Sequence, residues 1–250
     1  MSFLSRVCET NRKLNDRFFP RSKLRYVDRF GDLACELSRD GELVLHIGSG
    51  CKDLGSYPQL APRSLQVLNL DIGHQVLRKN PGRLRLCADA ETLPLRANSV
   101  GLICSEHAFE HFPRPQRVLE ECHRVLKEGG HLVVSGPNGW SYIALLARLT
   151  PIGLHNLVHH LGSNTGGNES SPCPTFYRFS TRRAMRRMAG KAGFAVVSIQ
   201  TFVGEPCYTT HLPLLHLAFI AYHKLLEKLN RIFNFHITSV AVLRKAAGKQ

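Results

Sequence analysis

The sequence contains no hydrophobic run long enough to cross a membrane. Its longest apolar stretch, residues 212–222, is too short to span a bilayer and is interrupted by His216. The opening residues, MSFLSRVCETNRKLNDRFF, also lack the continuous apolar segment of a secretory signal. The eight cysteines include no Cys-x-x-Cys pair, a spacing common in zinc sites and dithiol centres. These absences predict a cytoplasmic protein with reduced, mostly buried thiols and without a disulfide framework or metal site.

Acidic residues are scarce in the C-terminal part of the chain. Among residues 141–250, 13 lysines and arginines stand against three acids, Glu169, Glu205 and Glu227, whereas residues 1–140 are nearly balanced. Most of the formal net charge of +14 therefore lies after residue 140. This asymmetry suits an anionic partner, whether nucleic acid, a membrane surface or a phosphorylated substrate. It equally suits a solvated basic face that has no dedicated partner.

Apolar runs typical of buried strands alternate with helical patterns. The segment 115–128 repeats apolar residues at helical spacing, and Gly129 and Gly130 are expected to end this helix after Lys127. A basic helix follows Ser180 and Thr181, either of which can cap it. Strands separated by helices predict an α/β fold, with a largely parallel sheet and helices on both of its faces. The expected strands are residues 43–47, 64–72, 100–105, 130–136, 194–202 and 237–245.

The chain length suits a single α/β domain over residues 1–250 that begins with a helical segment, residues 1–41. Two stretches, 138–178 and 203–235, break the strand–helix alternation. Because ligands bind outside the carboxyl ends of the strands in such sheets, we expect both insertions on the substrate side. The apolar, then amphipathic residues 211–235 form either a lid over the pocket or a face resting in a membrane interface. The two roles are compatible for a lipid-linked ligand.

A predicted strand ends in the Gly-Ser-Gly sequence of residues 48–50, where glycine permits a tight turn and a close backbone approach to a ligand. The dinucleotide fingerprint Gly-x-Gly-x-x-Gly needs a third glycine where this chain has Asp53, which disfavours a nicotinamide or flavin enzyme. The next strand ends in Asp71, where a carboxylate can accept both hydroxyls of a ribose. Asp89 follows, where it can accept from the exocyclic amine of a purine.

Five stretches carry a family resemblance as an ordered set. They are VLHIGSG, NLDI, ADAETLPLRANSVGLICSEHAFEHF, VLEECHRVLKEGGHLVVSGPN and YRFSTRRAMRRMAGKAGF. They resemble successive motifs of class I S-adenosylmethionine-dependent methyltransferases, in particular methyltransferase type 11, closely over residues 42–138 and more loosely over 176–202. The resemblance implies a Rossmann-like, seven-stranded, mostly parallel sheet whose last strand, 237–245, is antiparallel. It also implies S-adenosylmethionine as the cofactor.

The same resemblance implies a set of cofactor-binding residues and two departures from the family. The family usually has an acid where this chain has His46, and a third glycine where it has Lys52. The acid commonly helps to hold the ammonium of the cofactor's methionine, and Asp53 or Glu106 can take its place. The implied contacts are Gly48, Ser49 and Gly50 with the methionine and ribose, Asp71 with the ribose hydroxyls, Asp89 and Ala90 with the adenine, and Ser105 and Glu106 under the methionine end, with His46 and Ile72 completing the set.

Methyl transfer to a hydroxyl requires a base. His107 and His111 follow the strand end nearest the expected methyl group, and a neutral imidazole titrates in the right range. Alternatively, His111 packs against the cofactor or caps a turn, since the Glu-His pair at 110–111 recurs in the family regardless of substrate. Tyr177 and Arg178 lie just before the basic helix, where they can meet an anionic group of the acceptor.

Three further histidines, His155, His159 and His160, have a spacing that can grip a metal, but no supporting ligand accompanies them. We therefore expect a helix face there and no metal site.

The sequence thus predicts an enzyme that O-methylates a small-molecule, glycan or lipid-linked acceptor. An RNA-modifying methyltransferase is the alternative, because the predicted basic helix carries four arginines that can bind phosphates. Aromatic residues that would stack on bases are not interleaved with them, and GPNG stands in place of the Asp/Asn-Pro-Pro-aromatic tetrapeptide of amino-methylating nucleic-acid enzymes. A non-catalytic cofactor-binding module is a third possibility, against which Asp71 and Asp89 argue. The four arginines are Arg182, Arg183, Arg186 and Arg187.

Overall fold

The computed structural model describes residues 3–18, 26–141, 174–202, 213–229 and 236–246. The chain folds into two compact units. The first gathers part of the N-terminal segment, residues 1–25, and most of the two stretches expected as insertions. The second contains nearly all of the sheet and the helices beside it. The expectation of a single domain stays a prediction. The first unit comprises residues 1–25, 138–172 and 201–238, and the second 26–137, 173–200 and 239–250.

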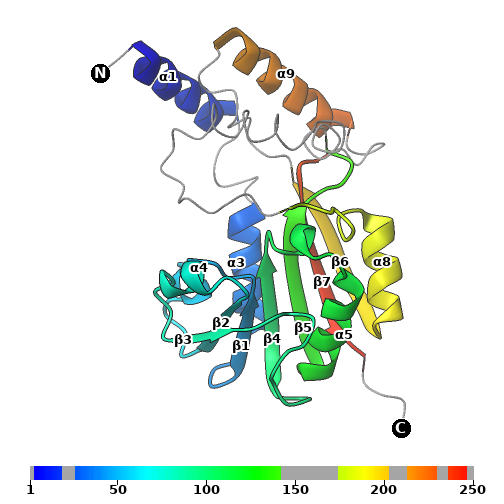
Figure 1. The fold of residues 1–250 in the computed structure, drawn as a ribbon. Helices are drawn as coiled ribbons and strands as arrows, with labels where there is room; N and C mark the ends of the chain where they lie inside the picture. Colours follow the sequence, from blue (N-terminus) through cyan, green and yellow to red (C-terminus); the bar gives the residue numbers. More distant parts are fainter. Residues whose placement is uncertain (1–2, 19–25, 142–173, 203–212, 230–235, 247–250) are drawn as a thin grey trace. The chain divides into compact units, whose positions relative to one another are not determined.

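The sheet of the second unit has seven strands in the order β3-β2-β1-β4-β5-β7-β6 (Figure 1). Six strands run parallel and β7 runs antiparallel, which confirms the expected Rossmann-like α/β architecture. The strand order reverses direction between β1 and β4, so their carboxyl ends mark the topological switch point where such sheets bind ligands. The strands are β1 (Leu43–Ile47), β2 (Gln66–Asp71), β3 (Leu84–Cys87), β4 (Val100–Glu106), β5 (Leu126–Pro137), β6 (Phe194–Phe202) and β7 (Thr238–Lys245).

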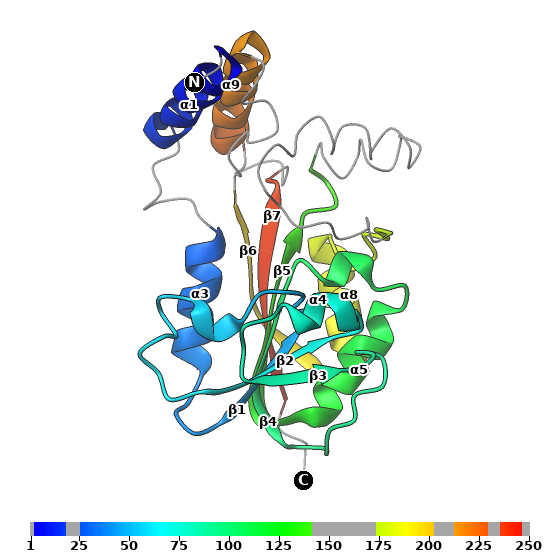
Figure 2. The ribbon, with the colours of Figure 1, turned by 60° about the vertical axis from the view of Figure 1, so that its left-hand side comes forward.

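Helices cover both faces of this sheet, as expected. Helix α3 (Tyr26–Leu37) lies on one face, and α5 (Pro115–Val125) and α8 (Arg182–Lys191) lie on the other (Figure 2). The hydroxyl of Thr181 caps α8 by accepting from the N–H of Ala184 at 3.1 Å, as one of the two predicted caps. Shorter elements are α4 (His74–Arg78) and the 3₁₀ helices η1 (Leu54–Ser56) and η2 (Phe109–His111).

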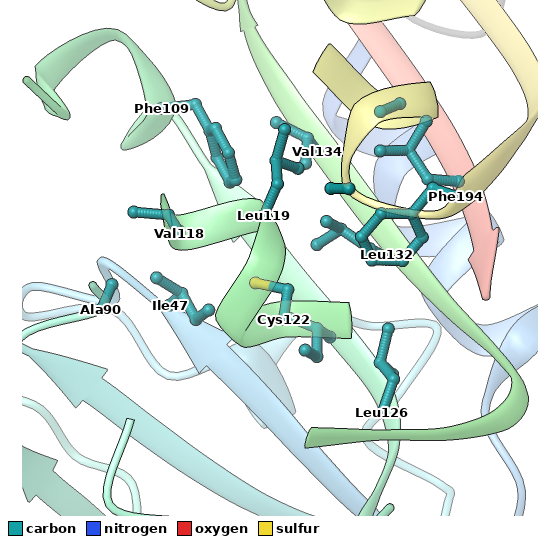
Figure 3. Close-up of a cluster of buried hydrophobic side chains, with 14 of the residues drawn as sticks. Ile47, Ala90, Phe109, Val118, Leu119, Cys122, Leu126, Leu132, Val134 and Phe194 are labelled. Carbon is teal, nitrogen blue, oxygen red and sulfur yellow. The ribbon is translucent and has the colours of Figure 1, made fainter. Parts of the chain in front are cut away.

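The main hydrophobic core lies between the sheet and helices α5 and α8. Helix α5 buries Val118, Leu119 and Cys122 completely, in agreement with the spacing of apolar residues in its sequence (Figure 3). Ile47 of β1 and Leu132 of β5 pack in the same cluster. The apolar residues of the central strands therefore anchor the strand ends at which the candidate site forms.

The boundary between α5 and β5 differs from the prediction. The helix ends at Val125 and the strand begins at Leu126, so Lys127 lies in the strand and not in the last helical turn. Leu126 pairs with Val100 and a register shift follows, while Gly129 takes a left-handed φ of 73°. The two glycines thus form a strand irregularity where the sequence suggested a helix stop.

Two further expectations were incomplete or wrong. Strand β3 was missed because it is an edge strand of only four mostly exposed residues, in which the alternation of leucine and arginine is too short to stand out. The cysteines are also less buried than expected: of the six in the described residues, only Cys104 and Cys122 are buried.

In the first unit, helices α1 (Phe3–Phe18) and α9 (Pro213–Leu229) contact each other (Figure 1). None of the described helices is long and apolar enough to cross a bilayer.

Candidate functional site

The glycines after β1 are required by the backbone conformation. Gly48 and Gly50 have φ values of 67° and 52°, in the left-handed region that side chains rarely adopt. A Cβ atom at Gly48 would also clash with the Cβ atom of Ala108. Lys52, in contrast, does not have a positive φ. The third family glycine is therefore dispensable in this loop, since Lys52 occupies its position without backbone strain.

Asp71, at the end of β2, organises this loop from the neighbouring strand. Its Oδ2 accepts from the N–H of Gly50 at 2.8 Å, and its Oδ1 accepts from the N–H of Gly73 at 2.7 Å. An ionised carboxylate has about four acceptor positions, so each oxygen keeps a free lone pair. Asp71 can accept further hydrogen bonds from a ligand while it holds the loop in place.

Asn80 fastens the loop from its other side. This buried side chain donates through Nδ2 to the carbonyl oxygens of Gly50 at 3.1 Å and Lys52 at 2.8 Å. Its Oδ1 accepts from the N–H of Gly82 at 2.8 Å. The loop is therefore preorganised by hydrogen bonds from β2 and from the segment after α4.

His46 occupies the position of the usual family acid, and a chain of hydrogen bonds leads from it to an acid. His46 pairs in register with Asn69, so their side chains lie on the same face of the sheet. Asn69 donates through Nδ2 to Asp53 at 2.8 Å, which leaves its Oδ1 to accept from His46 Nδ1 at 3.2 Å. Asp53 is thus held next to the glycine loop by a buried amide from β2.

Burial lowers the pKa of His46 below its ordinary 6.5. The hydrogen bond to Asn69 and the negative charges of Glu106 and Asp53 act in the opposite direction, but burial is the larger effect. His46 is therefore a neutral donor to Asn69 and not a cationic contact for a ligand.

Glu106, at the end of β4, is a second acid near this loop. Its side chain is 5% exposed and accepts from the hydroxyl of Tyr57 at 2.7 Å. The Nζ atom of Lys52 lies 3.7 Å from the same carboxylate oxygen, although the lysine side chain is 70% exposed. Burial and the neighbouring Glu106 raise the pKa of Tyr57, so its phenol stays protonated and donates.

The remaining predicted cofactor residues lie in different environments. Asp89 is exposed and its Oδ1 accepts from the N–H of Glu91 at 2.9 Å. The Ile72 side chain, beside Asp71, is 72% exposed. Ala90 packs in the hydrophobic core, and Ser105 is fully buried with no hydrogen bond to its hydroxyl from the described residues. The side chains of Asp89 and Ile72 are therefore accessible to a ligand, whereas those of Ala90 and Ser105 are buried, and the cofactor-binding role of all four stays a prediction.

His107 follows β4 directly and forms a pair with Glu110. Its Nδ1 lies 3.3 Å from Glu110 Oε1, and its ring meets Tyr26 edge-on with centroids 5.2 Å apart. Its Nε2 is buried without a hydrogen-bond partner among the described residues. The backbone of His107 has φ 51°, a strained conformation for a non-glycine residue that often marks functional sites.

His111, Tyr177 and Arg178 are engaged in local contacts. His111 Nδ1 donates to the carbonyl oxygen of Pro174 at 3.0 Å, and the N–H of Tyr177 donates to the carbonyl oxygen of Glu110 at 3.3 Å. Arg178 donates to the carbonyl oxygen of Pro113. These bonds tie the segment before α8 to η2, which favours the turn-stabilising alternative for His111 over the base.

The histidines weighed as metal ligands, His155, His159 and His160, lie outside the described residues. Within the residues described, no group of three or more His, Cys, Asp or Glu side chains has the geometry to hold a metal ion.

The sequence that forms this site matches a known domain. A family model described as a methyltransferase domain matches residues 45–134, from β1 into β5. This part of the chain is similar to a class I methyltransferase domain. The resemblance seen in the sequence motifs is thereby confirmed, and the cofactor of such a domain is S-adenosylmethionine.

Curated relatives of this methyltransferase domain differ in substrate. The chain is 50% identical over 101 residues to a malonyl-[acyl-carrier protein] O-methyltransferase of Alcanivorax borkumensis, covering 38% of this chain and 34% of that protein. It is 27% identical over 180 residues to a ubiquinone/menaquinone biosynthesis C-methyltransferase of Sinorhizobium fredii, covering 66% of this chain and 69% of that protein. The chain spans about a third of the length of the first curated relatives that it matches.

Solved structures share the fold of the methyltransferase domain. One is the geranyl diphosphate C-methyltransferase of Streptomyces coelicolor, in complex with Mg²⁺, geranyl-S-thiolodiphosphate and S-adenosyl-L-homocysteine. The TM-score is 0.56 at 12% identity, with 88% of this chain and 76% of that chain covered. At this identity the likeness extends to the fold alone.

The sequence alone did not identify four residues that contribute to the candidate site. Asn69, Tyr57, Asn80 and Glu110 act through other residues, and no motif contains them as a set. Asn69 carried a usable signal, because an amide inside the apolar run VLNLD is costly to bury without partners. The other three became recognisable only through their contacts.

Proposed function

We propose that the protein is an S-adenosylmethionine-dependent methyltransferase that O-methylates a small-molecule acceptor, free or linked to a lipid or glycan. The observation that carries the proposal is the preorganised loop at the switch point, in which Asp71 holds Gly50 and keeps acceptor positions free. The match of residues 45–134 to a methyltransferase domain supports it.

The residues around this loop fit S-adenosylmethionine, which supplies a methyl group on a positively charged sulfonium. Asp71 would accept the ribose hydroxyls, while exposed Ile72 and Asp89 would contact the adenine. The left-handed glycines leave the loop without side chains that would keep the methionine and ribose away. Asp53 and Glu106 supply the negative charge for the cationic methionine end, in place of the family acid that His46 replaces.

His107 is the proposed base. Glu110 accepts from Nδ1–H, which leaves the Nε2 lone pair to take the proton from an acceptor hydroxyl as the oxygen gains the methyl group. The resulting imidazolium is stabilised by the Glu110 carboxylate. Burying a nitrogen without a hydrogen-bond partner is unfavourable, and a role as proton acceptor would explain why His107 Nε2 has no partner among the described residues. The wider family includes quinone and malonyl-carrier relatives, which support a small organic acceptor.

Calorimetric titration with S-adenosylmethionine tests the cofactor part of the proposal. The wild-type chain should bind, and Asp71→Ala should weaken binding by about 100-fold, because hydrogen bonds to a charged group contribute about 1.5–3 kcal/mol each. Arg186→Ala, on the exposed side of α8, is the matched control and should bind normally. Absence of binding by the wild-type chain, or an unchanged affinity of the Asp71 variant, would refute the proposal.

Methyl transfer from labelled cofactor to phenolic, carboxylic and RNA acceptors separates the alternatives. Transfer to a phenol or carboxylate supports the proposal. Salt-sensitive transfer to RNA would favour the nucleic-acid alternative, for which the exposed arginines of α8 are the relevant feature. Cofactor binding without transfer to any acceptor would favour the non-catalytic alternative.

A further inference from the structure

Helix α9 exposes most of its described apolar residues and buries two histidines. The side chains of His216 and His223 are 0% exposed, whereas Leu214 is 84% and Leu225 53% exposed. A helix on the surface of a globular protein normally shows the opposite arrangement, with leucine inward and polar residues outward. The outward side of α9 therefore needs an explanation other than packing within the described unit.

The exposed apolar residues form one continuous stripe. Leu214, Ala218, Ala221 and Leu225 recur at spacings of three and four and so lie on one side of the helix. The stripe runs along most of a helix about 25 Å long. We call this stripe with its flanking residues the leucine face. It consists of Leu214, Leu215, Leu217, Ala218, Ala221, Tyr222 and Leu225, all of them exposed.

Exposed basic residues lie on both helices of this pair, α9 and α1. Helix α9 packs on α1 (Figure 1). His216, which is buried on the side away from the leucine face, has its Nε2 3.2 Å from the carbonyl oxygen of Asn11. Lys228 is exposed at the C-terminal end of α9. Helix α1 adds four exposed basic residues against two acids. The four are Arg6, Arg12, Lys13 and Arg17, and the acids are Glu9 and Asp16.

We propose that the leucine face docks into the interface of an anionic lipid bilayer, with α9 parallel to the membrane plane. An apolar face on a helix pair that carries exposed lysine and arginine matches such a surface, because leucine enters the acyl boundary while the basic groups are attracted to the lipid phosphates. A symmetric contact with a second copy would bring two basic helix pairs together, which disfavours self-association. The proposal does not depend on methyltransferase activity.

Cosedimentation of the full chain with lipid vesicles tests this proposal. The chain should bind vesicles of phosphatidylcholine with phosphatidylglycerol more tightly than vesicles of phosphatidylcholine alone, and added salt should reduce the difference. The triple variant Leu214→Ser, Leu217→Ser, Leu225→Ser should lower the partition coefficient about 100-fold, since each leucine loses its apolar contact. Arg17→Gln with Lys228→Gln should lower it about tenfold, and only on the anionic vesicles.

Leu84→Ser with Val197→Ser is the matched control. Both residues are exposed apolar side chains on strands of the sheet, so their loss should leave vesicle binding unchanged. The serine variants remove exposed side chains only, and circular dichroism should show that each remains folded.

Three results would overturn the proposal. They are failure of the wild-type chain to bind anionic vesicles, equal binding by the triple leucine variant, and a concentration-dependent dimer that the triple variant abolishes while neither protein binds vesicles. The last result would assign the face to a second copy. Vesicle binding by a chain that does not bind S-adenosylmethionine would refute the proposed activity and leave the membrane surface standing.

Discussion

The same strands present different chemistry on the two faces of the sheet. On the side of α5 and α8, Leu45, Ile47 and Ile103 are fully buried in an apolar cluster. On the other side, the register places His46 beside Asn69, and the next strand brings Cys104 and Glu106 to the same face. One face is mostly apolar along its length, while the other, which also buries Val44 and Leu102, buries polar groups at the strand ends that hold the glycine loop.

This difference has a physical cost. A buried polar group is tolerated only when its hydrogen bonds are made, and the bonds from His46 through Asn69 to Asp53 meet this requirement. Hydrophobic side chains at the same positions would stabilise the sheet but release the loop. The comparison therefore predicts that substitutions on the apolar face affect stability alone, whereas those on the polar face also affect the cofactor.

Removing bulk from the apolar face should have the largest effect. Ile103→Ala leaves a cavity under α5 and should lower the free energy of unfolding by about 2–5 kcal/mol, measured by urea denaturation. Affinity for S-adenosylmethionine should be unchanged in the folded variant. Val197→Ala, at an exposed position of β6, is the control and should be nearly neutral. A weakened cofactor affinity in the Ile103 variant would contradict the prediction that the apolar face affects stability alone.

On the polar face, Asn69→Leu should cost less stability but impair binding. The change leaves Asp53 and His46 without their shared partner, and buried groups that lose a partner cost about 1–3 kcal/mol. Calorimetry should show a cofactor affinity reduced about tenfold, because Asp53 is no longer held beside the loop. If stability falls while affinity is preserved, the amide has only a structural role.

Glu110 should act as a positioning residue for His107. The hydrogen bond to a carboxylate contributes about 1.5–3 kcal/mol, enough to keep the His107 proton on Nδ1. Nitrogen-15 NMR of the imidazole should show this tautomer in the wild type and its loss in Glu110→Leu, while Glu110→Asp should retain it in part. An identical spectrum in the leucine variant would exclude the positioning role, whatever happens to turnover.

The smallest effect should appear as a pH dependence of stability. Burial lowers the pKa of His46 below 6.5, so the unfolded chain binds its proton more readily than the folded chain. The resulting stability is present above pH 6.5 and is lost as the pH falls below it, at no more than about 1.4 kcal/mol per pH unit. Urea denaturation between pH 7.5 and pH 5 should show this loss reduced in His46→Gln. An equal pH dependence in both proteins would assign it to other histidines.

Sequence patterns predicted the apolar face well because burial leaves a periodic trace. The strands 43–47 and 194–202 agree with β1 and β6, and the buried face of α5 follows its apolar spacing. The edge strand β3 left only a short trace, two leucines that alternate with arginine, since it has four residues and most of them are exposed. The start of β5 was missed because pairing of Leu126 with Val100 outweighed a local helix signal.

The polar face could be predicted only in part. Gly48, Gly50 and Asp71 were identified because ligand-binding loops constrain residue type and spacing. Asn69 and Tyr57 were not, because their roles arise from partners that are distant in sequence, such as the 49 positions between Tyr57 and Glu106. Long-range hydrogen bonds of this kind depend on the register of the strands, which local patterns do not encode.

The position of β7 constrains the order in which the sheet can form. This strand is the last of the seven along the chain, yet it lies between β5 and β6. Lys245, at its end, is buried and donates to the carbonyl oxygen of Leu126 at 2.9 Å and to Asn98 at 2.7 Å. During synthesis β6 therefore leaves the ribosome with no place beside β5 until β7 follows. The sheet closes late, and an unpaired edge of β5 is exposed to chaperones or to other chains until it does.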